Sequence, residues 1–163
     1  MTTTIFDIEK AINDSFKKSI IDLKKGLIEL EEDLRACMYH HLRGFVDDST
    51  DLTILLSHNV SDFPPAKKPD IVIFRQDEYL VGIELKLHPY NKLKGKTDIE
   101  RLQEFGSFLK RGYFIHVDKK KKTFRKTKDS WKNNYYRELF YTKELDQITL
   151  VEHKQNQVFT STV

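Results

Sequence analysis

The chain has few cysteines, glycines and prolines, and it has no long apolar run. Cys37 is the one cysteine among 163 residues, so no internal disulfide can form and a reducing cytoplasm is the expected compartment. No stretch approaches 18 apolar residues, and the N-terminal segment MTTTIFDIEK carries acids where a signal peptide would carry bases. The six glycines are scattered, so a glycine-rich phosphate loop is absent and NTP hydrolysis by such a loop is not expected.

The chain is rich in charged and aromatic residues. Its hydrophobic content of 39% and aromatic content of 12% predict a globular protein with a real core. We find no internal repeat and no low-complexity linker, so we expect a single domain. The net charge is only +3, yet residues 119–128 hold seven bases and no acid, so subtracting those seven charges leaves about −4 for the rest. This basic block is therefore a candidate surface for an anionic partner.

The N-terminal quarter is predicted to be helical, because apolar residues recur at threes and fours from Ile8 to Met38. Gly26 either divides this segment into two helices or is tolerated within one helix at a cost of about 1 kcal/mol relative to Ala. The near-heptad spacing over residues 5–42 would also suit a dimer of long helices.

The remaining chain is predicted to alternate strands with helices. We expect a helix that begins at Thr97, where Glu100 completes a capping box, and that stops near Gly112. We also expect a helix or turn around Trp131–Phe140. The predicted strands are Leu52–Leu56, Asp70–Phe74, Tyr79–Leu87, Tyr113–Val117, Ile148–Glu152 and Val158–Thr160. This order predicts an α/β (α+β) domain with a mixed central sheet flanked by helices.

The most informative segment is KPDIVIFRQDEYLVGIELKL, which reads as two strands joined by a polar turn. Strand side chains alternate between faces, so Glu84 and Lys86 share one face while Ile83 and Leu85 take the other. Asp70 is likewise out of phase with the apolar residues of its own strand. Two carboxylates beside an amine are typical of metal-assisted hydrolysis. The alternative is an exposed hairpin whose Glu84 and Lys86 form a solvated ion pair worth ~0–1 kcal/mol.

A third carboxylate is expected from the N-terminal helical segment. At 100° per residue, Leu27, Leu30, Leu34 and Met38 cluster within about 80°, and Glu31 falls inside that fan. An acid on a buried stripe is costly unless it is paired or bound to a metal. The alternative is that Glu31 lies at the edge of the stripe, or pairs with Arg35 at i+4.

Two further candidates for chemistry lie on the same helical segment. His40 and His41 lack the additional nitrogen or sulfur ligands that zinc requires, so a structural role for His41 on the apolar stripe is expected. No relay that would activate Cys37 is visible, and a buried thiol is expected there.

Taken together, these segments resemble the PD-(D/E)xK nuclease superfamily, which has the restriction-endonuclease-like fold. Pro69-Asp70 matches the PD element, Glu84-Leu85-Lys86 matches the (D/E)xK element, EEDLRACMYHHLR resembles the first core helix, and TDIERLQEFG resembles the helix after the motif. The likeness covers about half of the chain. It implies an αβββαβ core at residues 27–118, with residues 1–26 as an N-terminal helical extension and residues 119–163 as a basic loop and C-terminal elements.

The resemblance also implies an activity. Asp70 and Glu84 would be metal ligands, Glu31 a ligand or a water-mediated contact, and Lys86 the activator of the attacking water. The cofactor would be Mg²⁺, with Mn²⁺ as a substitute, and the expected function is that of a Mg²⁺-dependent nuclease acting on DNA in repair, recombination, restriction or mobile-element defence. The alternative is a catalytically inactive nucleic-acid-binding or interaction module on the same fold.

The expected partners are nucleic acid and a second copy of the chain. The basic block could contact phosphates, with Phe124 available to stack on a base, or it could be a solvated loop or an import-like signal. The N-terminal helices could support a homodimer. The candidate phosphate-contacting bases are Lys92, Lys94, Lys96, Lys119, Lys120, Lys121, Lys122, Arg125, Lys126 and Lys128.

Overall fold

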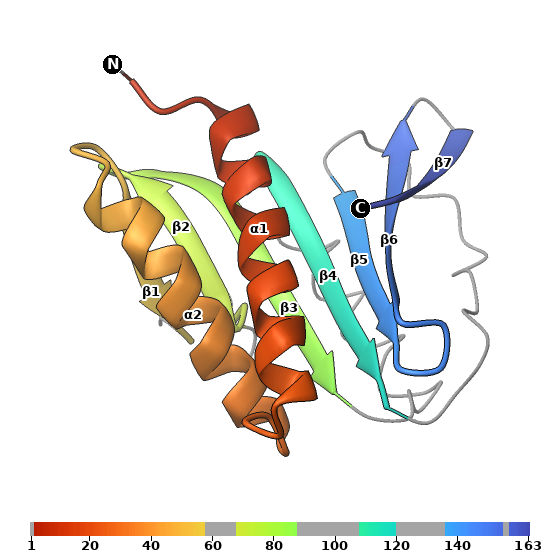
Figure 1. The fold of residues 1–163 in the computed structure, drawn as a ribbon. Coiled ribbons are helices and arrows are strands. Elements are labelled where there is room, and N and C mark those ends of the chain that lie inside the picture. Colours follow the sequence, from red (N-terminus) through yellow and green to blue (C-terminus); the bar gives the residue numbers. More distant parts are fainter. Residues whose placement is uncertain (1, 58–67, 88–107, 120–135, 155–156) are drawn as a thin grey trace.

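The computed structural model describes residues 2–57, 68–87, 108–119, 136–154 and 157–163 (Figure 1). Within these residues the chain forms two helices and a seven-stranded sheet. The elements are α1 (Ile5–Lys24), α2 (Glu31–Asp47), β1 (Thr53–Leu56), β2 (Ile71–Arg75), β3 (Glu78–Leu87), β4 (Arg111–Asp118), β5 (Tyr136–Thr142), β6 (Gln147–Lys154) and β7 (Gln157–Thr162). This is the α+β class that the sequence predicts.

The sheet is mixed, and its strands lie side by side in chain order from β1 to β7. Neighbours are antiparallel from β1 to β3, parallel from β3 to β5, and antiparallel again from β5 to β7. Both helices cover the same face of the sheet (Figure 1). The predicted mixed sheet is therefore confirmed, and all six predicted strands are confirmed to within a few residues.

The prediction of a helix or turn around Trp131–Phe140 is wrong from residue 136 onward, because β5 begins there. Leu139 is fully buried on the helix side, while Phe140 is buried on the other side. A strand covered on both faces has no polar alternation, so its sequence does not distinguish it from a short buried helix. The predicted helix that begins at Thr97 lies almost wholly outside the described residues.

Gly26 divides the N-terminal helical segment into two helices. Its φ of +79° lies in the left-handed region that favours glycine, and it terminates α1. Leu27 and Leu30, which the single-helix alternative placed on the apolar stripe, are each 61% exposed in the linker. The Asp33 carboxylate then accepts hydrogen bonds from the Glu29 and Leu30 N–H groups and starts α2. The alternative of one continuous helix is therefore wrong.

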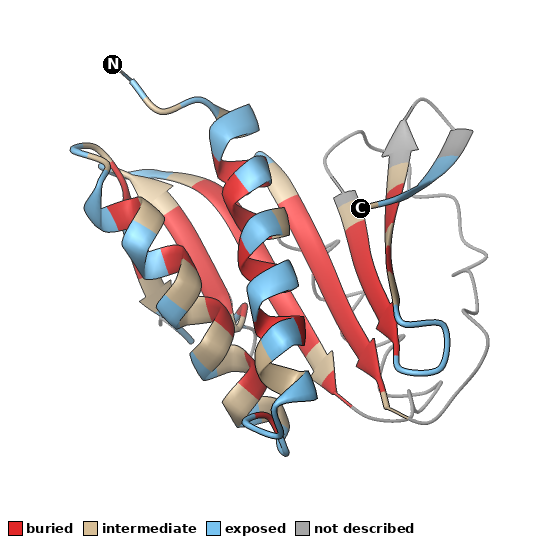
Figure 2. Ribbon diagram, in the orientation of Figure 1, coloured by how far each residue is buried: buried red, intermediate tan, exposed pale blue. Residues whose placement is uncertain are grey.

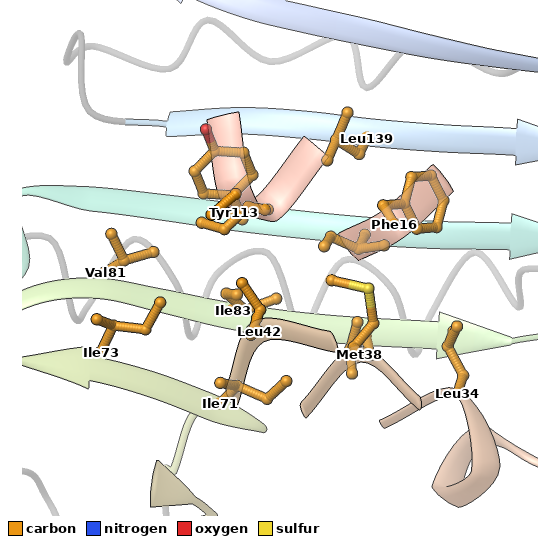
Figure 3. Close-up of a cluster of buried hydrophobic side chains, with 14 of the residues drawn as sticks. Phe16, Leu34, Met38, Leu42, Ile71, Ile73, Val81, Ile83, Tyr113 and Leu139 are labelled. Carbon is orange, nitrogen blue, oxygen red and sulfur yellow. The ribbon is translucent and has the colours of Figure 1, made fainter. Parts of the chain in front are cut away.

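The core lies between the two helices and the sheet (Figures 2 and 3). Phe16 of α1 and Met38 of α2 are fully buried against Ile71, Ile83 and Tyr113 of the sheet. Burial of each large apolar side chain stabilises the fold by about 1.5–3 kcal/mol. The apolar stripe of α1 is thus part of this core, although the sequence assigns residues 1–26 to an extension. The long helix that would support a homodimer does not form, and the dimer itself stays a prediction.

The other face of the sheet carries buried polar side chains in its centre. Glu84 of β3 and Glu138 of β5 flank Phe114 of β4 in one cross-strand row, because the two parallel pairings are in register. Glu84 is 2% exposed, so a carboxylate is buried on β3, an interior strand of the sheet. Among the described helices, neither is long and apolar enough to cross a membrane.

Candidate functional site

Glu31 is the first residue of α2, and its carboxylate reaches the C-terminal end of β3. Oε1 accepts a hydrogen bond from Lys86 Nζ at 2.9 Å, and Oε2 accepts one from the Leu87 N–H at 3.4 Å. An acid in the first turn of a helix is also favoured by the helix dipole. The structure therefore brings together two of the predicted site residues, 55 positions apart in the chain.

Asp70 immediately precedes β2 and lies beside the middle of the (D/E)xK segment. Its Oδ2 accepts a hydrogen bond from the Leu85 N–H at 2.8 Å. Ile71 pairs with Ile83 on the antiparallel neighbour β3, so the same register continued by one residue sets Asp70 opposite Glu84. Residues directly opposite on antiparallel strands project to the same face with Cβ atoms roughly 4.5–5.5 Å apart. Asp70 itself precedes β2, so this register sets its backbone level with Glu84, while its carboxylate is held by the Leu85 N–H.

The electrostatic environment of Asp70 connects it to the same group. Burial raises the pKa of the Asp70 carboxyl, and the nearby Glu31 raises it further. The Leu85 N–H, Lys86 and Arg35 lower this pKa without cancelling the effect of burial. Burial therefore makes the ionised form of Asp70 less favourable, and an additional cation would stabilise it.

Glu84 is on the same face of β3 as Lys86, as the strand alternation predicts. The core side chains of β3 next to it, Ile83 and Leu85, point to the helix side instead. Desolvating a carboxylate to this degree is costly unless charge or hydrogen bonds compensate it. The exposed-hairpin alternative is therefore wrong for Glu84, which is 2% exposed.

The reasoning that selected Glu31 is wrong for two of its four reference residues, Leu27 and Leu30, although it leads to a residue at the site. The stripe was drawn partly through Leu27 and Leu30, which lie outside α2 and are exposed. Within α2, Glu31 is in phase with the buried Leu34 and Met38, so it lies at the N-terminal end of the buried stripe. Its side chain is 37% exposed. The alternative that Glu31 pairs with Arg35 is also wrong, since its carboxylate bonds to Lys86 and Leu87.

Arg35 is a site residue that the sequence did not identify. One turn after Glu31 on α2, its Nη1 lies 3.3 Å from Asp70 Oδ1 and 3.3 Å from Ser57 Oγ. Ser57 follows β1, and its N–H donates to the Asp70 carbonyl at 3.0 Å. The i, i+4 spacing from Glu31 was the available signal, because it places both side chains on one face of the helix.

The donor atoms suit Mg²⁺. This ion prefers oxygen ligands and usually takes one or two carboxylates together with waters and substrate phosphate. Asp70 and Glu84 can provide such a pair, whereas the described residues contain no ready group of three or more acidic, histidine or cysteine ligands. Glu31 would have to exchange Lys86 for the ion to become a third ligand.

The surroundings of His41 and Cys37 on α2 are those of residues with a structural role. His41 Nε2 lies 2.8 Å from Asp22 Oδ2, so it ties α2 to α1 as a paired histidine, in agreement with the expected structural role. Burial raises the pKa of the partly buried Cys37 thiol, and Asp22 and Asp33 raise it further. A thiol of this kind is a poor nucleophile.

Only one of the predicted phosphate-contacting bases belongs to the described residues. Lys119 Nζ donates to the carbonyls of Ile28 and Glu29 at 2.9 and 3.1 Å, and so links the end of β4 to the linker before α2. The others lie outside the described residues: Lys92, Lys94, Lys96, Lys120, Lys121, Lys122, Arg125, Lys126 and Lys128.

Comparison of the chain with protein-family models, with curated proteins and with solved structures finds no match in any of the three.

Proposed function

We propose that this protein is a Mg²⁺-dependent nuclease that hydrolyses phosphodiester bonds, with DNA as the expected substrate. The observation that carries the proposal is the meeting of Glu31, Asp70 and Lys86, from three separate elements, at the C-terminal half of β3. The sequence predicted Asp70 and Lys86 from the PD and (D/E)xK elements and Glu31 from its position on a helix, so their convergence supports the assignment of the site.

The order of the elements supports membership of the PD-(D/E)xK superfamily. One helix, α2, is followed by the antiparallel strands β1, β2 and β3 and then by β4, which is parallel to β3. The αβββαβ pattern has a helix before its last strand, and the sequence predicts that helix from Thr97 to near Gly112. The PD element immediately precedes β2, and the (D/E)xK element lies on β3.

The residues divide the chemistry between them. Asp70 and Glu84 would hold the metal ion, which when bound polarises a phosphoryl oxygen and lowers the pKa of a coordinated water. Lys86 orients the attacking water or neutralises the charge that develops on the phosphorus oxygens. Glu31 holds the Lys86 ammonium at 2.9 Å and so fixes its direction. Repair, recombination, restriction and defence against mobile elements are the processes in which such an activity fits.

A cleavage assay tests the proposal. Purified protein is incubated with labelled linear, branched and single-stranded DNA, and with RNA, in Mg²⁺ and in EDTA. We expect the protein to cleave in the presence of Mg²⁺ and not in the presence of EDTA. Lys86→Ala should reduce the rate by about 10²–10⁴-fold, the typical contribution of a proton-transfer or charge-stabilising group. Asp70→Ala and Glu84→Ala should remove Mg²⁺ binding, which calorimetry measures.

Lys110→Ala is a matched control for Lys86→Ala. Lys110 also pairs with a glutamate, Glu78, but both side chains are about half exposed and lie at the other end of β3. A Lys86→Ala variant that cuts as fast as Lys110→Ala would refute the site assignment. Nucleic-acid binding without cleavage in wild type would instead favour the inactive binding module.

A further inference from the structure

Arg35 occupies a specific position in the candidate site. It is on α2, and its guanidinium bonds through a single nitrogen, Nη1, to both Asp70 Oδ1 and Ser57 Oγ. The Nε and Nη2 donors are therefore not committed to either of these two groups. The side chain is 33% exposed, so a ligand at the site can reach it.

The two oxygens of Asp70 have different partners. Oδ2 accepts from the backbone of β3, and Oδ1 faces the Arg35 guanidinium. A cation bound at Asp70 must therefore share Oδ1 with Arg35 or take it over. In either case the guanidinium lies next to the position where the metal-coordinated phosphate of a substrate would have to be.

Ser57 accepts a hydrogen bond from the same guanidinium nitrogen and has a strained backbone. Its φ of +40° is in the left-handed region, which is unfavourable for a residue other than glycine. The strained residue is fixed by its N–H bond to the Asp70 carbonyl. The backbone conformation that places the Ser57 hydroxyl on Arg35 is therefore fixed by the residue that carries the site carboxylate.

We propose that Arg35 is a substrate-binding residue of the site, and that its guanidinium donates to a phosphate oxygen of the nucleic acid beside the metal ligands. The inference rests on the proposed function and adds a residue that the motif does not contain. Arginine suits this task because its planar fork of donors matches phosphate oxygens, and only one of its nitrogens is bonded to Asp70 and Ser57.

The test compares two arginines of α2. Arg35→Gln and Arg43→Gln are each made in the Lys86→Ala protein, so that DNA is bound but not cut in Mg²⁺. Arg43 is a suitable control because it also pairs with an aspartate, Asp47. Its side chain is 52% exposed and lies away from the site. The probe is a fluorescein-labelled DNA duplex, and its anisotropy is measured at several salt concentrations.

We expect Arg35→Gln to weaken binding about tenfold or more, the usual effect of losing a charge-assisted hydrogen bond. The plot of log affinity against log salt should become less steep by about 0.9, because one phosphate contact is lost. A residue that only supports the fold would leave this slope unchanged. Arg43→Gln should alter neither quantity.

Arg35→Lys provides a second variant that keeps a cation beside Asp70 and preserves the fold. It should keep the salt slope but bind DNA more weakly, since a lysine offers no planar fork. Wild-type affinity in either Arg35 variant overturns the proposal. If the Lys86→Ala parent binds Mg²⁺ by calorimetry and DNA by anisotropy, such a result concerns Arg35 alone. A parent that binds neither refutes the proposed function and this inference with it.

Discussion

Two clusters of charged side chains lie on the same sheet but differ in the balance between their acids and bases. The first, which we call the Glu9 network, joins α1 to the sheet on the helix side. Glu9 accepts from Arg111 Nε at 2.8 Å and from Arg137 Nη1 at 2.9 Å, and Arg137 Nη2 donates to Glu152 at 2.8 Å. Two acids thus face two bases, and both oxygens of Glu9 are used.

The candidate site has a surplus of acid. Glu31, Asp70 and Glu84 are accompanied by Lys86 and Arg35, which leaves one formal negative charge among these five side chains. The two clusters are separated along the strands, since Arg111 is level with Val81 and Lys86 is five residues further, about 17 Å. A balanced network suits a structural role, and a surplus of negative charge suits a site that receives a cation.

The largest expected effect is on the Glu9 network. Glu9→Gln should destabilise the protein by about 3 kcal/mol, because it leaves two guanidiniums beside a neutral amide. This loss of stability is at the low end of the range for breaking a buried ion pair, because the Arg111 side chain is 28% exposed. Urea unfolding measures the change. The Mg²⁺ affinity should stay at the wild-type value, and a matching loss of Mg²⁺ binding would remove the distinction between the clusters.

The next effect concerns the response to metal. At ten times its dissociation constant, Mg²⁺ should stabilise the wild-type fold by about 1.4 kcal/mol. Glu84→Gln should lose this gain, whereas Glu9→Gln should retain it despite a lower baseline. Thermal melts with and without Mg²⁺ provide the comparison. Equal gains in Glu84→Gln and wild type would show that the ion binds elsewhere.

Substitution of Glu31 tests the contrast between the two clusters through a smaller expected change in stability. Like Glu9, Glu31 is a helix glutamate that pairs with a base on a strand, but its side chain is 37% exposed and that of Glu9 only 7%. Glu31→Gln should therefore cost about 0–1 kcal/mol in urea unfolding, as for exposed ion pairs. Its effect on cleavage should be larger than on stability, because Lys86 loses its orienting partner. A loss of stability equal to that of Glu9→Gln would assign Glu31 to the scaffold.

The smallest effect is a change in pH dependence. Burial raises the pKa of Asp70, so the folded state binds this proton more tightly than the unfolded chain does. Stability from this group is present at low pH and is lost as the pH rises above about 3.8, the ordinary value, through the raised pKa. In metal-free buffer, Asp70→Asn should therefore be more stable than wild type at neutral pH.

The difference between Asp70→Asn and wild type should vanish in acid, where Asp70 is also uncharged. Urea unfolding across the pH range measures it. The effect is small because Lys86, Arg35 and the Leu85 N–H offset part of the burial cost. If the wild-type protein is more stable than Asp70→Asn at neutral pH, the charge of Asp70 is compensated by its neighbouring bases, as that of Glu9 is.

The strand part of the site was predictable because it depends on local alternation. Glu84 and Lys86 share a face of β3 whatever the rest of the fold does, and the turn at residues 76–77 pairs their strand with the one that follows Asp70. The helical part was not predictable in the same way. Which residues belong to its apolar stripe depends on where α2 begins, and Gly26 and Asp33 determine that start through a left-handed residue and a side-chain cap.

Contacts between distant elements could not be predicted from one sequence. Arg35, Ser57 and Asp70 belong to α2, the end of β1 and the start of β2, so their meeting is a property of the tertiary packing. The same holds for the Glu9 network, where Glu9 reads as one more polar residue of a helix. The strand β5 was missed because burial on both faces removes the alternation by which a strand is identified.

The way β3 is connected has a consequence for the kinetics of folding. β2 and β3 are joined by a two-residue turn, whereas the parallel partner β4 follows only after residues 88–110. A hairpin closes within about 1–10 μs, while pairings between distant segments must first overcome the entropy of closing a longer loop. β2, which follows Asp70, and β3, which carries Glu84, therefore come together in a fast local step, and the slower parallel pairings complete the sheet around them.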